Sequence, residues 1–332
     1  MTGREEENLK IEKTIQRRVK DAPVVLKKYM TSISRLTPAS RKVYLGYLFD
    51  FFYFLKEKYD IDGNSFDDFQ RIKKMDIENY IEYTKINPKT GKENGISIRN
   101  SRLAAVMSLF DFLIDNEFIT KNPCISIRKL KDNREKKVTY LTKEEIEDIK
   151  VNITTTSRSI YHEDPWAKRD YAIFILGCST GLRNSAIREI NVEDLDLKNK
   201  EVRVFEKDSV VKTVCLSTQT CAAIEEWLNI RQILLNKKQK ESNAVFISNQ
   251  MNRITSTGLQ DILKKYTKGI KKHISPHKMR STCAMNLYEK TGDIYLVSEV
   301  LGHKDVRNTQ IYAKATKEKL RQAADIMDEI YN

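Results

Sequence analysis

A histidine and a tyrosine stand nine residues apart in the segment LGHKDVRNTQIYAKAT, which covers residues 301–316. Gly302 and His303 are expected to form a turn, and Asp305 is expected to cap a following helix. Tyr312 is expected to lie on that helix between polar neighbours. Little of this segment has the composition of a core, and the chain contains only four histidines. The pair is therefore a candidate for chemistry, provided that other reactive groups reach the same place.

Known metal-binding and nucleotide-binding motifs do not explain the pair. The sequence contains no carboxylate cluster, HExxH motif, Cys/His ligand set or GxxxxGK[ST] loop. His273 and His277 are four residues apart, but Pro276 lies between them and no third ligand is evident. An enzyme that acts on a phosphate group without a metal needs fixed positive charges. Arginine suits this task, because its planar guanidinium binds two phosphate oxygens and stays charged near neutral pH. We therefore expect no metal and no cofactor.

Two arginines and a histidine are placed to supply such charge. Arg183 follows a Thr-Gly turn at a predicted helix start in STGLRNSAIREI. In SPHKMRSTCA, His277 and Arg280 are three residues apart, so both side chains can point the same way on a helix. The run of residues 264–280 holds seven Lys or Arg and no acid. Lys207, near a predicted hairpin turn, adds a further cation.

The whole chain is basic, with a net charge of +13 over 332 residues. Such a surplus favours an anionic partner, most simply nucleic acid bound through its phosphates, although a basic solvated surface is the alternative. Five cysteines without a CxxC pair are typical of reduced thiols in the cytoplasm. The longest apolar run, around residues 172–176, is too short to cross a bilayer, so we expect no membrane association.

Helical periodicity predicts a first domain over residues 21–125, preceded by a charged lead of residues 1–20. Pro123 ends the helical block, and residues 128–137 are charge-rich without an apolar period, which predicts a linker over residues 126–140. Two apolar stripes recur at three- and four-residue spacing within the helical domain. They consist of Tyr44, Tyr47, Leu48, Phe51, Phe54 and Leu55, and of Leu103, Val106, Met107, Phe110 and Ile114.

The second domain, residues 141–316, is predicted to be mainly helical with one small sheet. Thr142 and Glu145 have the spacing of a capping box at a helix start. Strand-like alternation occurs in three segments, which predict a three-stranded antiparallel sheet: Leu195 to Leu197, Val202 to Val204, and Val214 to Leu216. Residues 317–332 are predicted to form a C-terminal helix. Its narrow apolar face consists of Leu320, Ala324, Met327 and Tyr331.

The segments TGLR, SPHKMR and LGHKDVRNTQIY, with the hairpin lysine between the first two, resemble the tyrosine recombinases, the phage integrase and Xer-like family. The resemblance covers almost all of the second domain, and its most specific part is the box from Leu301 to Tyr312. It implies a mainly α fold with a small antiparallel sheet (α+β). A helical core-binding domain and a catalytic domain would form a C-shaped clamp around duplex DNA. Residues 317–332 would dock on a neighbouring protomer.

Residue by residue, the resemblance implies one reaction. Tyr312 attacks a DNA phosphodiester, forms a 3′-phosphotyrosyl bond and frees a 5′-hydroxyl. A free tyrosine has a pKa of about 10, so this nucleophile requires a proton acceptor or a strongly cationic site. The supporting groups are the phosphate-binding Arg183 and Arg280, the hydrogen-bonding and proton-moving His277 and His303, and the general acid Lys207.

Three positions depart from the family pattern. Glu206 and Asp208 replace the glycines that usually flank the active lysine, and Lys212 on the opposing strand competes with Lys207 for that role. Alignment of the hairpin favours Lys207. Ala186 stands three positions after the first arginine, where the family normally has an acidic residue. We expect a differently supported active site there, not an inactive enzyme.

Basic residues outside the active site are candidates for phosphate contacts. Four of them flank the apolar stripes of the first domain, and one belongs to the SPHKMR motif. For the first four, a solvated surface charge is the alternative. The candidates are Arg41, Lys42, Arg99, Arg102 and Lys278.

Together these features predict a cytoplasmic, nucleoid-associated site-specific recombinase that acts as a homo-tetramer on paired sites in double-stranded DNA. It would be the integrase of a mobile element or an Xer-like resolvase. One alternative is a type IB topoisomerase, which uses similar chemistry as a monomer. Another is a DNA-binding regulator that kept the fold but lost catalysis. The histidine of SPHKMR and the C-terminal tail favour the recombinase, whereas Ala186 favours the regulator.

Overall fold

The computed structural model describes residues 3–87, 90–132, 138–155, 164–205, 211–267, 269–270, 272, 274–303, 305–313, 321, 324–328 and 330. The chain divides into two compact units, Met1–Glu135 (the first domain) and Lys136–Asn332 (the second domain). Each has a hydrophobic core of its own, which is the property that lets a unit fold around itself.

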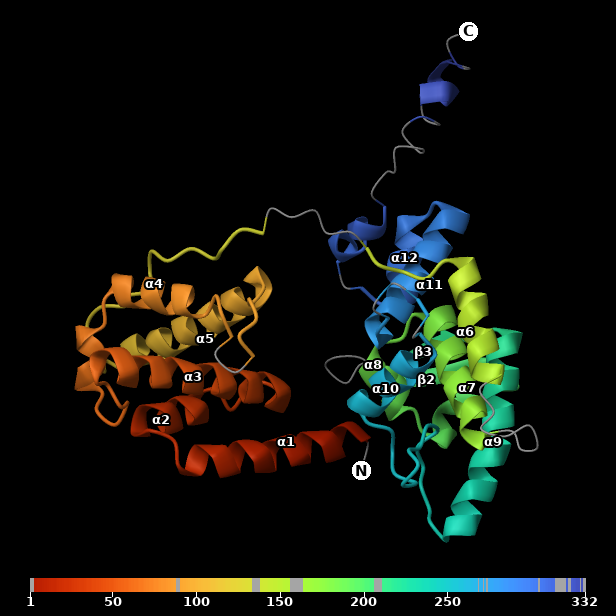
Figure 1. Ribbon diagram of the computed structural model, residues 1–332, viewed down its shortest axis with the longest axis horizontal. Helices are drawn as coiled ribbons and strands as arrows, with labels where there is room; N and C mark the ends of the chain where they lie inside the picture. Colours follow the sequence, from red (N-terminus) through yellow and green to blue (C-terminus); the bar gives the residue numbers. More distant parts are fainter. Residues whose placement is uncertain are drawn as a thin grey trace. The chain divides into compact units, whose positions relative to one another are not determined.

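The first domain is a set of packed helices (Figure 1). Its central helix begins after Thr37, whose hydroxyl accepts a hydrogen bond from the Ser40 N–H. The predicted stripes form its core, since Phe51 and Phe110 are fully buried and their ring centroids are 6.3 Å apart. The elements are α1 (Gly3–Lys20), α2 (Val24–Ser32), α3 (Pro38–Tyr59), the 3₁₀ helix η1 (Asp67–Arg71), α4 (Lys74–Tyr83) and α5 (Ile96–Asp115).

Two segments predicted to lie outside the first domain contribute to its core. The charged lead is α1, an 18-residue helix that packs on α3 and buries Ile15. Ile127 and Leu130 of the predicted linker also pack against this core. The Asn100 side chain donates to the Leu130 carbonyl at 2.9 Å and accepts from the Leu130 N–H at 2.8 Å. A few apolar side chains among many charges are enough to anchor both segments.

The second domain is built around a buried helix, α7. It packs against α6, α9 and α11, and its apolar run of residues 172–176 is buried throughout. The capping box at the start of α6 is confirmed, because Thr142 and Glu145 exchange both expected hydrogen bonds. The helices are α6 (Lys143–Thr155), α7 (Pro165–Thr180), α8 (Asn184–Glu189), α9 (Thr218–Lys238), α10 (Ser256–Tyr266), α11 (Pro276–Thr291) and α12 (Ile294–Leu301), with 3₁₀ helices η2 (Val192–Asp194), η4 (Val306–Asn308) and η5 (Gln310–Tyr312).

One antiparallel sheet accompanies these helices, in the order β1-β2-β3. The strands are β1 (Leu195–Asp196), β2 (Glu201–Phe205) and β3 (Val211–Cys215). Val202 pairs with Val214, and both side chains face the core. The predicted three-stranded sheet and the mainly helical α+β class are therefore confirmed.

The end of the chain exposes apolar side chains. Residues 324–328 are helical and exposed, and Ile326, Met327 and Ile330 are 55%, 47% and 66% exposed. Met327 and Ala324 belong to the predicted apolar face, whereas its other members, Leu320 and Tyr331, lie outside the described residues. Among the residues that the structure describes, no helix has the length and apolar character of a membrane span.

Candidate active site

The buried guanidinium of Arg280 connects the three sequence motifs. Arg280 lies in the second turn of α11 and is 6% exposed. Its Nη1 donates to the Gly181 carbonyl at 2.8 Å, and its Nη2 donates to the Leu301 carbonyl at 2.6 Å. Gly181 caps the C-terminus of α7, and Leu301 is the last residue of α12. Helix C-termini carry partial negative charge, so this environment favours a buried cation.

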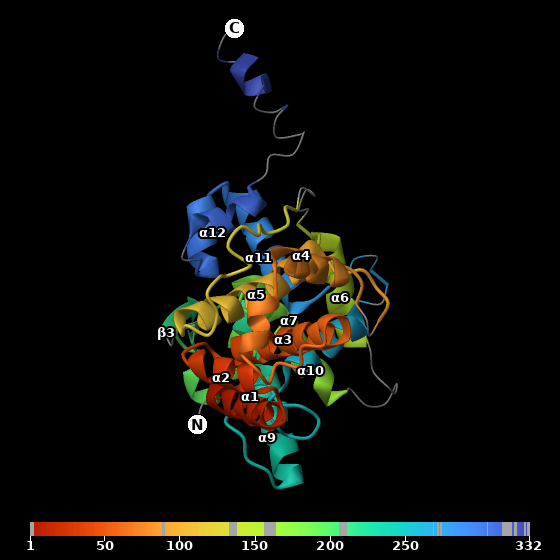
Figure 2. The same ribbon diagram turned by 90° about the vertical axis from the view of Figure 1, so that its left-hand side faces the viewer.

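The carbonyls of Gly181 and Leu301 can both reach one guanidinium because position 181 is a glycine. Its φ of +63° is in the left-handed region, where side chains are disfavoured. A Cβ at this position would lie 2.7 Å from Cδ2 of Leu301 and 3.3 Å from Sγ of Cys283. The glycine of TGLR thus permits both the turn and the close approach of α7 to α12. Figures 1 and 2 show α11 beside α12, as their contacts require.

The connected motifs present their other polar side chains at the surface. Arg183, two residues after Gly181, is exposed at the N-cap of α8. His277 is exposed in the first turn of α11, three residues before Arg280. Lys278 beside it is partly exposed. One buried arginine therefore holds together segments that carry an exposed arginine and an exposed histidine.

His303 follows α12 in a turn that Gly302 makes possible with a φ of +64°. The His303 N–H donates to the Ser298 carbonyl at 3.0 Å, which continues the end of the helix. The imidazole is partly exposed, and its Nδ1 lies 2.7 Å from Oγ1 of Thr309. The ring is therefore held by a residue six positions further along the chain.

The prediction for the surroundings of Tyr312 is wrong in two respects. Asp305 caps η4, as its carboxylate accepts from the Arg307 N–H at 2.9 Å, but Tyr312 lies on a separate 3₁₀ helix, η5. The tyrosine is also only 6% exposed, in a cluster with Ala284, Val297 and Leu301. The chain from Val306 to Tyr312 forms two short 3₁₀ turns and not one α-helix, and Tyr312 packs against residues of α11 and α12.

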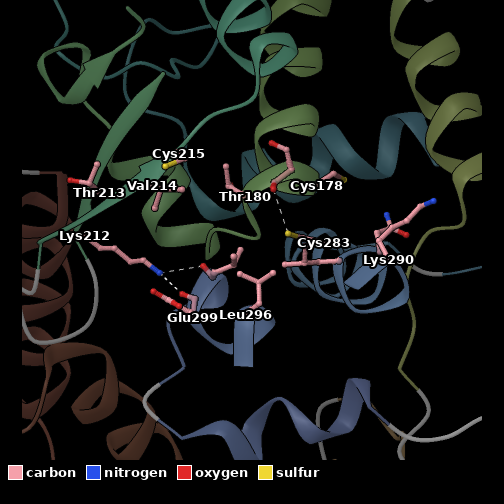
Figure 3. Close-up of a pocket in the computed structure, with 14 residues that line it drawn as sticks. Cys178, Thr180, Lys212, Thr213, Val214, Cys215, Cys283, Lys290, Leu296 and Glu299 are labelled. Carbon is pink, nitrogen blue, oxygen red and sulfur yellow. Dashed lines mark hydrogen bonds between the residues drawn. The ribbon is translucent and has the colours of Figure 1, made fainter. Parts of the chain in front are cut away.

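Of the two lysines of the hairpin, the structure describes only Lys212. Lys207 lies outside the described residues. Lys212, on β3, donates from Nζ to the carbonyl of Glu299 at 2.6 Å and to that of Val300 at 3.3 Å (Figure 3). It therefore caps the C-terminus of α12, a role that the sequence did not reveal because the two segments are more than 80 residues apart.

Ala186 lies in the apolar core. It is 6% exposed and belongs to the same buried cluster as Ile187, its neighbour on α8. A carboxylate at this position would have to be buried among apolar side chains or turn away from them. The alanine therefore fits its surroundings in this chain.

Arg41, Arg99 and Arg102 have acidic partners within the first domain. Arg41 pairs with Glu12 at 2.6 Å, Arg99 with Glu82 at 3.1 Å, and Arg102 with Asp50 at 2.8 Å.

Arg102 is the most buried of the three, at 8% exposed. Although burial favours its neutral form, contacts with Tyr80 and Asp50 hold the pKa of Arg102 above its ordinary value. Lys42, in contrast, is exposed. The phosphate contacts of these residues and of Lys278 stay a prediction.

Comparisons with known proteins identify the family. Residues 139–319 match the model of the phage integrase family. The chain belongs to this family, the tyrosine recombinases. It is 30% identical over 296 residues to the tyrosine recombinase XerD of Oceanobacillus iheyensis. The matched region covers 82% of this chain and 94% of that protein. It is also 30% identical to XerC of Escherichia coli over 226 residues, 68% of this chain and 72% of XerC.

Solved structures share the fold of this recombinase. XerH bound to a palindromic difH substrate in a post-cleavage complex matches with a TM-score of 0.70 and 19% identity, over 91% of this chain and 84% of that chain. A lambda integrase dimer bound to a COC′ core site matches with a TM-score of 0.62 and 16% identity, over 85% of this chain and 94% of that chain. The predicted family, fold class and function as a site-specific recombinase that cleaves and rejoins DNA are confirmed.

The bridge made by Arg280 predicts a specific loss of stability. In an Arg280→Lys variant, one ammonium replaces the planar fork and leaves a buried carbonyl without its donor. We expect the free energy of unfolding of the second domain to fall by about 1–3 kcal/mol. Tryptophan fluorescence during urea denaturation measures this domain alone, because both tryptophans, Trp166 and Trp227, belong to it.

Arg183→Lys is the matched control for this stability measurement, since it makes the same substitution at an exposed arginine of the same domain. We expect its free energy of unfolding to change by less than about 0.5 kcal/mol. Equal losses for the two variants would contradict the structural role of Arg280.

Proposed function

We propose that Tyr312 is the nucleophile of this recombinase and that the groups joined through Arg280 surround the scissile phosphate. The Tyr312 oxygen forms a bond to phosphorus as the bond from phosphorus to the 5′-oxygen breaks. The tyrosine loses its proton to an acceptor in the site, and the 5′-oxygen gains one. The proposed supporting groups are Arg183 and Arg280 as phosphate ligands, His277 and His303 as hydrogen-bonding and proton-moving groups, and Lys207 as general acid.

The bond of Arg280 to both Gly181 and Leu301 carries this proposal. It brings the turn before Arg183 and the turn before His303 to one guanidinium. A guanidinium has five N–H donors, so holding two carbonyls is compatible with donating to a phosphate oxygen as well. Positive groups positioned in advance stabilise the charge that builds on the pentacoordinate phosphorus.

The burial of Tyr312 adds a step before the chemistry. At 6% exposure, the phenol has to become accessible before it can attack a phosphodiester. We propose that DNA binding moves η5 relative to the cluster of Ala284 and Val297. Since η5 is a single 3₁₀ turn of three residues, it can move without unfolding of the domain core.

The nucleophile is tested with a nicked suicide duplex that contains the recombination site. The wild-type protein is expected to form a covalent protein–DNA adduct, and Tyr312→Phe is expected to form none, because the variant lacks only the attacking oxygen. Denaturing gel electrophoresis measures the adduct, and a mobility shift assay on intact duplex measures binding, which should not change.

Tyr295→Phe is the control for the nucleophile, because this tyrosine lies on α12 and is 72% exposed. It is expected to form the adduct at the wild-type rate. An adduct with Tyr312→Phe would refute the assignment. A wild-type protein that binds its site without forming an adduct would support the DNA-binding regulator.

The general acid is identified by changing the leaving group. We expect Lys207→Met to cleave an ordinary duplex about 10²- to 10⁴-fold more slowly. A 5′-bridging sulfur in the substrate should restore that rate, because a thiolate leaves without a proton. Lys212→Met should also slow cleavage, through loss of the α12 cap, but sulfur should not restore it.

Gel-based cleavage rates on the oxygen and sulfur substrates, with wild-type protein as reference, separate the two lysines. Rescue of Lys212→Met by sulfur, without rescue of Lys207→Met, would make Lys212 the general acid. The cap of α12 described above would then be a resting contact of that lysine.

We further propose that the recombinase acts on paired specific sites in double-stranded DNA of the cytoplasmic nucleoid. The relatives named XerD and XerC support an Xer-like resolvase, because XerD aligns over 94% of its length. The other biological task that we propose is integration of a mobile element. Both tasks use the same cleavage and joining chemistry.

We propose that four copies assemble on paired sites through their C-terminal segments. Ile326, Met327 and Ile330 of this segment are exposed, and Asp325 and Asp328 stand among them. Apolar side chains with carboxylates beside them gain stability by packing on an apolar surface with basic residues.

The second domain has a cavity that fits such a segment. Its volume is about 640 Å³, and it lies between β3, the end of α7, α11 and α12 (Figure 3). Val214, Leu287 and Leu296 contribute apolar surface, and Lys212 and Lys290 contribute basic side chains. We propose this cavity as the place where the C-terminal segment of a neighbouring copy binds.

The assembly is tested with the double variant Met327→Asp and Ile330→Asp. Charges on the apolar face should remove the paired-site complex in native gels and sedimentation, while the affinity for a single site stays unchanged. Leu296→Asp in the cavity should have the same effect.

Ile233→Asp is the control for assembly, because Ile233 on α9 is 66% exposed, the same as Ile330. We expect this variant to assemble normally. Normal paired-site complexes with the double variant would refute docking through the C-terminal segment.

A further inference from the structure

Thr309 links the two residues that are proposed to act on one phosphate, His303 and Tyr312. Thr309 is fully buried between η4 and η5. Its Oγ1 lies 2.7 Å from Nδ1 of His303, and its carbonyl accepts from the Tyr312 N–H at 2.9 Å. A single residue therefore contacts the imidazole through its side chain and the nucleophile's backbone through its main chain.

The direction of this hydrogen bond depends on which imidazole nitrogen carries the proton. A neutral histidine has one protonated nitrogen, and the hydrogen bond of the other nitrogen selects the tautomer. If the Thr309 hydroxyl donates to the lone pair of Nδ1, the proton of the neutral ring is on Nε2. When the ring is charged, Nδ1–H can donate to the same hydroxyl, because a hydroxyl also accepts. Nε2 is then a hydrogen-bond donor in either state.

We propose that Thr309 is a positioning residue, whose hydroxyl holds His303 with Nε2–H as the donor to the scissile phosphate. The proposal rests on the proposed function, in which His303 contacts that phosphate. A phosphate oxygen accepts hydrogen bonds, so the opposite tautomer, with a lone pair on Nε2, would repel it. The hydrogen bond from the Tyr312 N–H to the Thr309 carbonyl fixes the backbone of the nucleophile relative to the residue that holds the ring.

Thr309 is suited to this role by its burial and by its lack of charge. Since the side chain is fully buried, its hydroxyl is shielded from water. A carboxylate in its place would attract a charged imidazolium. A hydroxyl orients the ring without adding a charge beside a phosphate that the site has to bind.

The tautomer is measured without DNA. Thr309→Val replaces the hydroxyl by a methyl group of the same shape. In protein labelled with ¹⁵N-histidine, we expect the wild type to show His303 with an unprotonated Nδ1 and a protonated Nε2. The valine variant should show a mixture of tautomers, and Thr309→Ser should restore the wild-type spectrum. His303→Gln identifies the signal among the four histidines.

Thr220→Val is the matched control for loss of a buried hydroxyl. Thr220 is also fully buried, and its Oγ1 lies 2.8 Å from the hydroxyl of Ser217. This variant is expected to change thermal stability but not the His303 spectrum. A wild-type His303 spectrum in Thr309→Val would overturn the proposal, whatever the cleavage rate.

The consequence for cleavage is measured with the suicide duplex. We expect Thr309→Val to slow adduct formation by about ten- to a hundredfold, and Thr309→Ser to recover most of that rate. In a His303→Gln background, Thr309→Val should cause no further loss, because its effect passes through the imidazole. Additive losses would overturn the positioning role and leave a structural one.

The failure of this proposal differs from failure of the proposed function. A changed tautomer with an unchanged cleavage rate would overturn the link between the ring and the phosphate. If His303→Gln cleaved at the wild-type rate, the assignment of His303 itself would fail, and the link from Thr309 to the phosphate would fail with it. The tautomer selected by Thr309 would still be read from the spectrum.

Discussion

A buried positive charge between two helix ends organises the second domain. The guanidinium of Arg280 occupies the place where α7 and α12 terminate, and it donates to the carbonyls of Gly181 and Leu301. Burying a guanidinium costs free energy unless its donors are satisfied, and helix C-termini supply both the acceptors and a favourable field. The planar fork presents its two terminal nitrogens to carbonyls of two different helices, with a fixed geometry that a single ammonium does not have.

The end of α12 receives cations from two other elements. Lys212 of β3 donates to the carbonyls of Glu299 and Val300, and Arg280 of α11 donates to that of Leu301. The last three carbonyls of this helix are thereby fixed relative to the sheet and to α11. His303 follows two residues later, so its position depends on both contacts. An arginine proposed to bind phosphate is thus also part of the fold, and substitutions of it affect stability as well as catalysis.

The same residue type serves different purposes in the two domains. Arg102 in the first domain is paired with Asp50 and buried, so its charge is compensated within the domain. Arg280 donates to two neutral carbonyls, which belong to the ends of two helices. Net charge along the sequence does not distinguish these two situations, because pairing depends on which residues meet in space.

The sequence by itself determined the family motifs, the three-stranded sheet, the capping box at α6 and the two helical stripes, because each depends on residues close together in the chain. The order of TGLR, SPHKMR and LGHKDVRNTQIY was sufficient to predict a site-specific recombinase. Tertiary structure decided what local spacing does not contain. It buried Tyr312 on a 3₁₀ turn, paired Arg41 with Glu12, used Lys212 as a cap for α12, and placed Thr309 against His303. Periodicity specifies which side chains share a face of one element, but a hydrogen bond between elements depends on how their ends pack together.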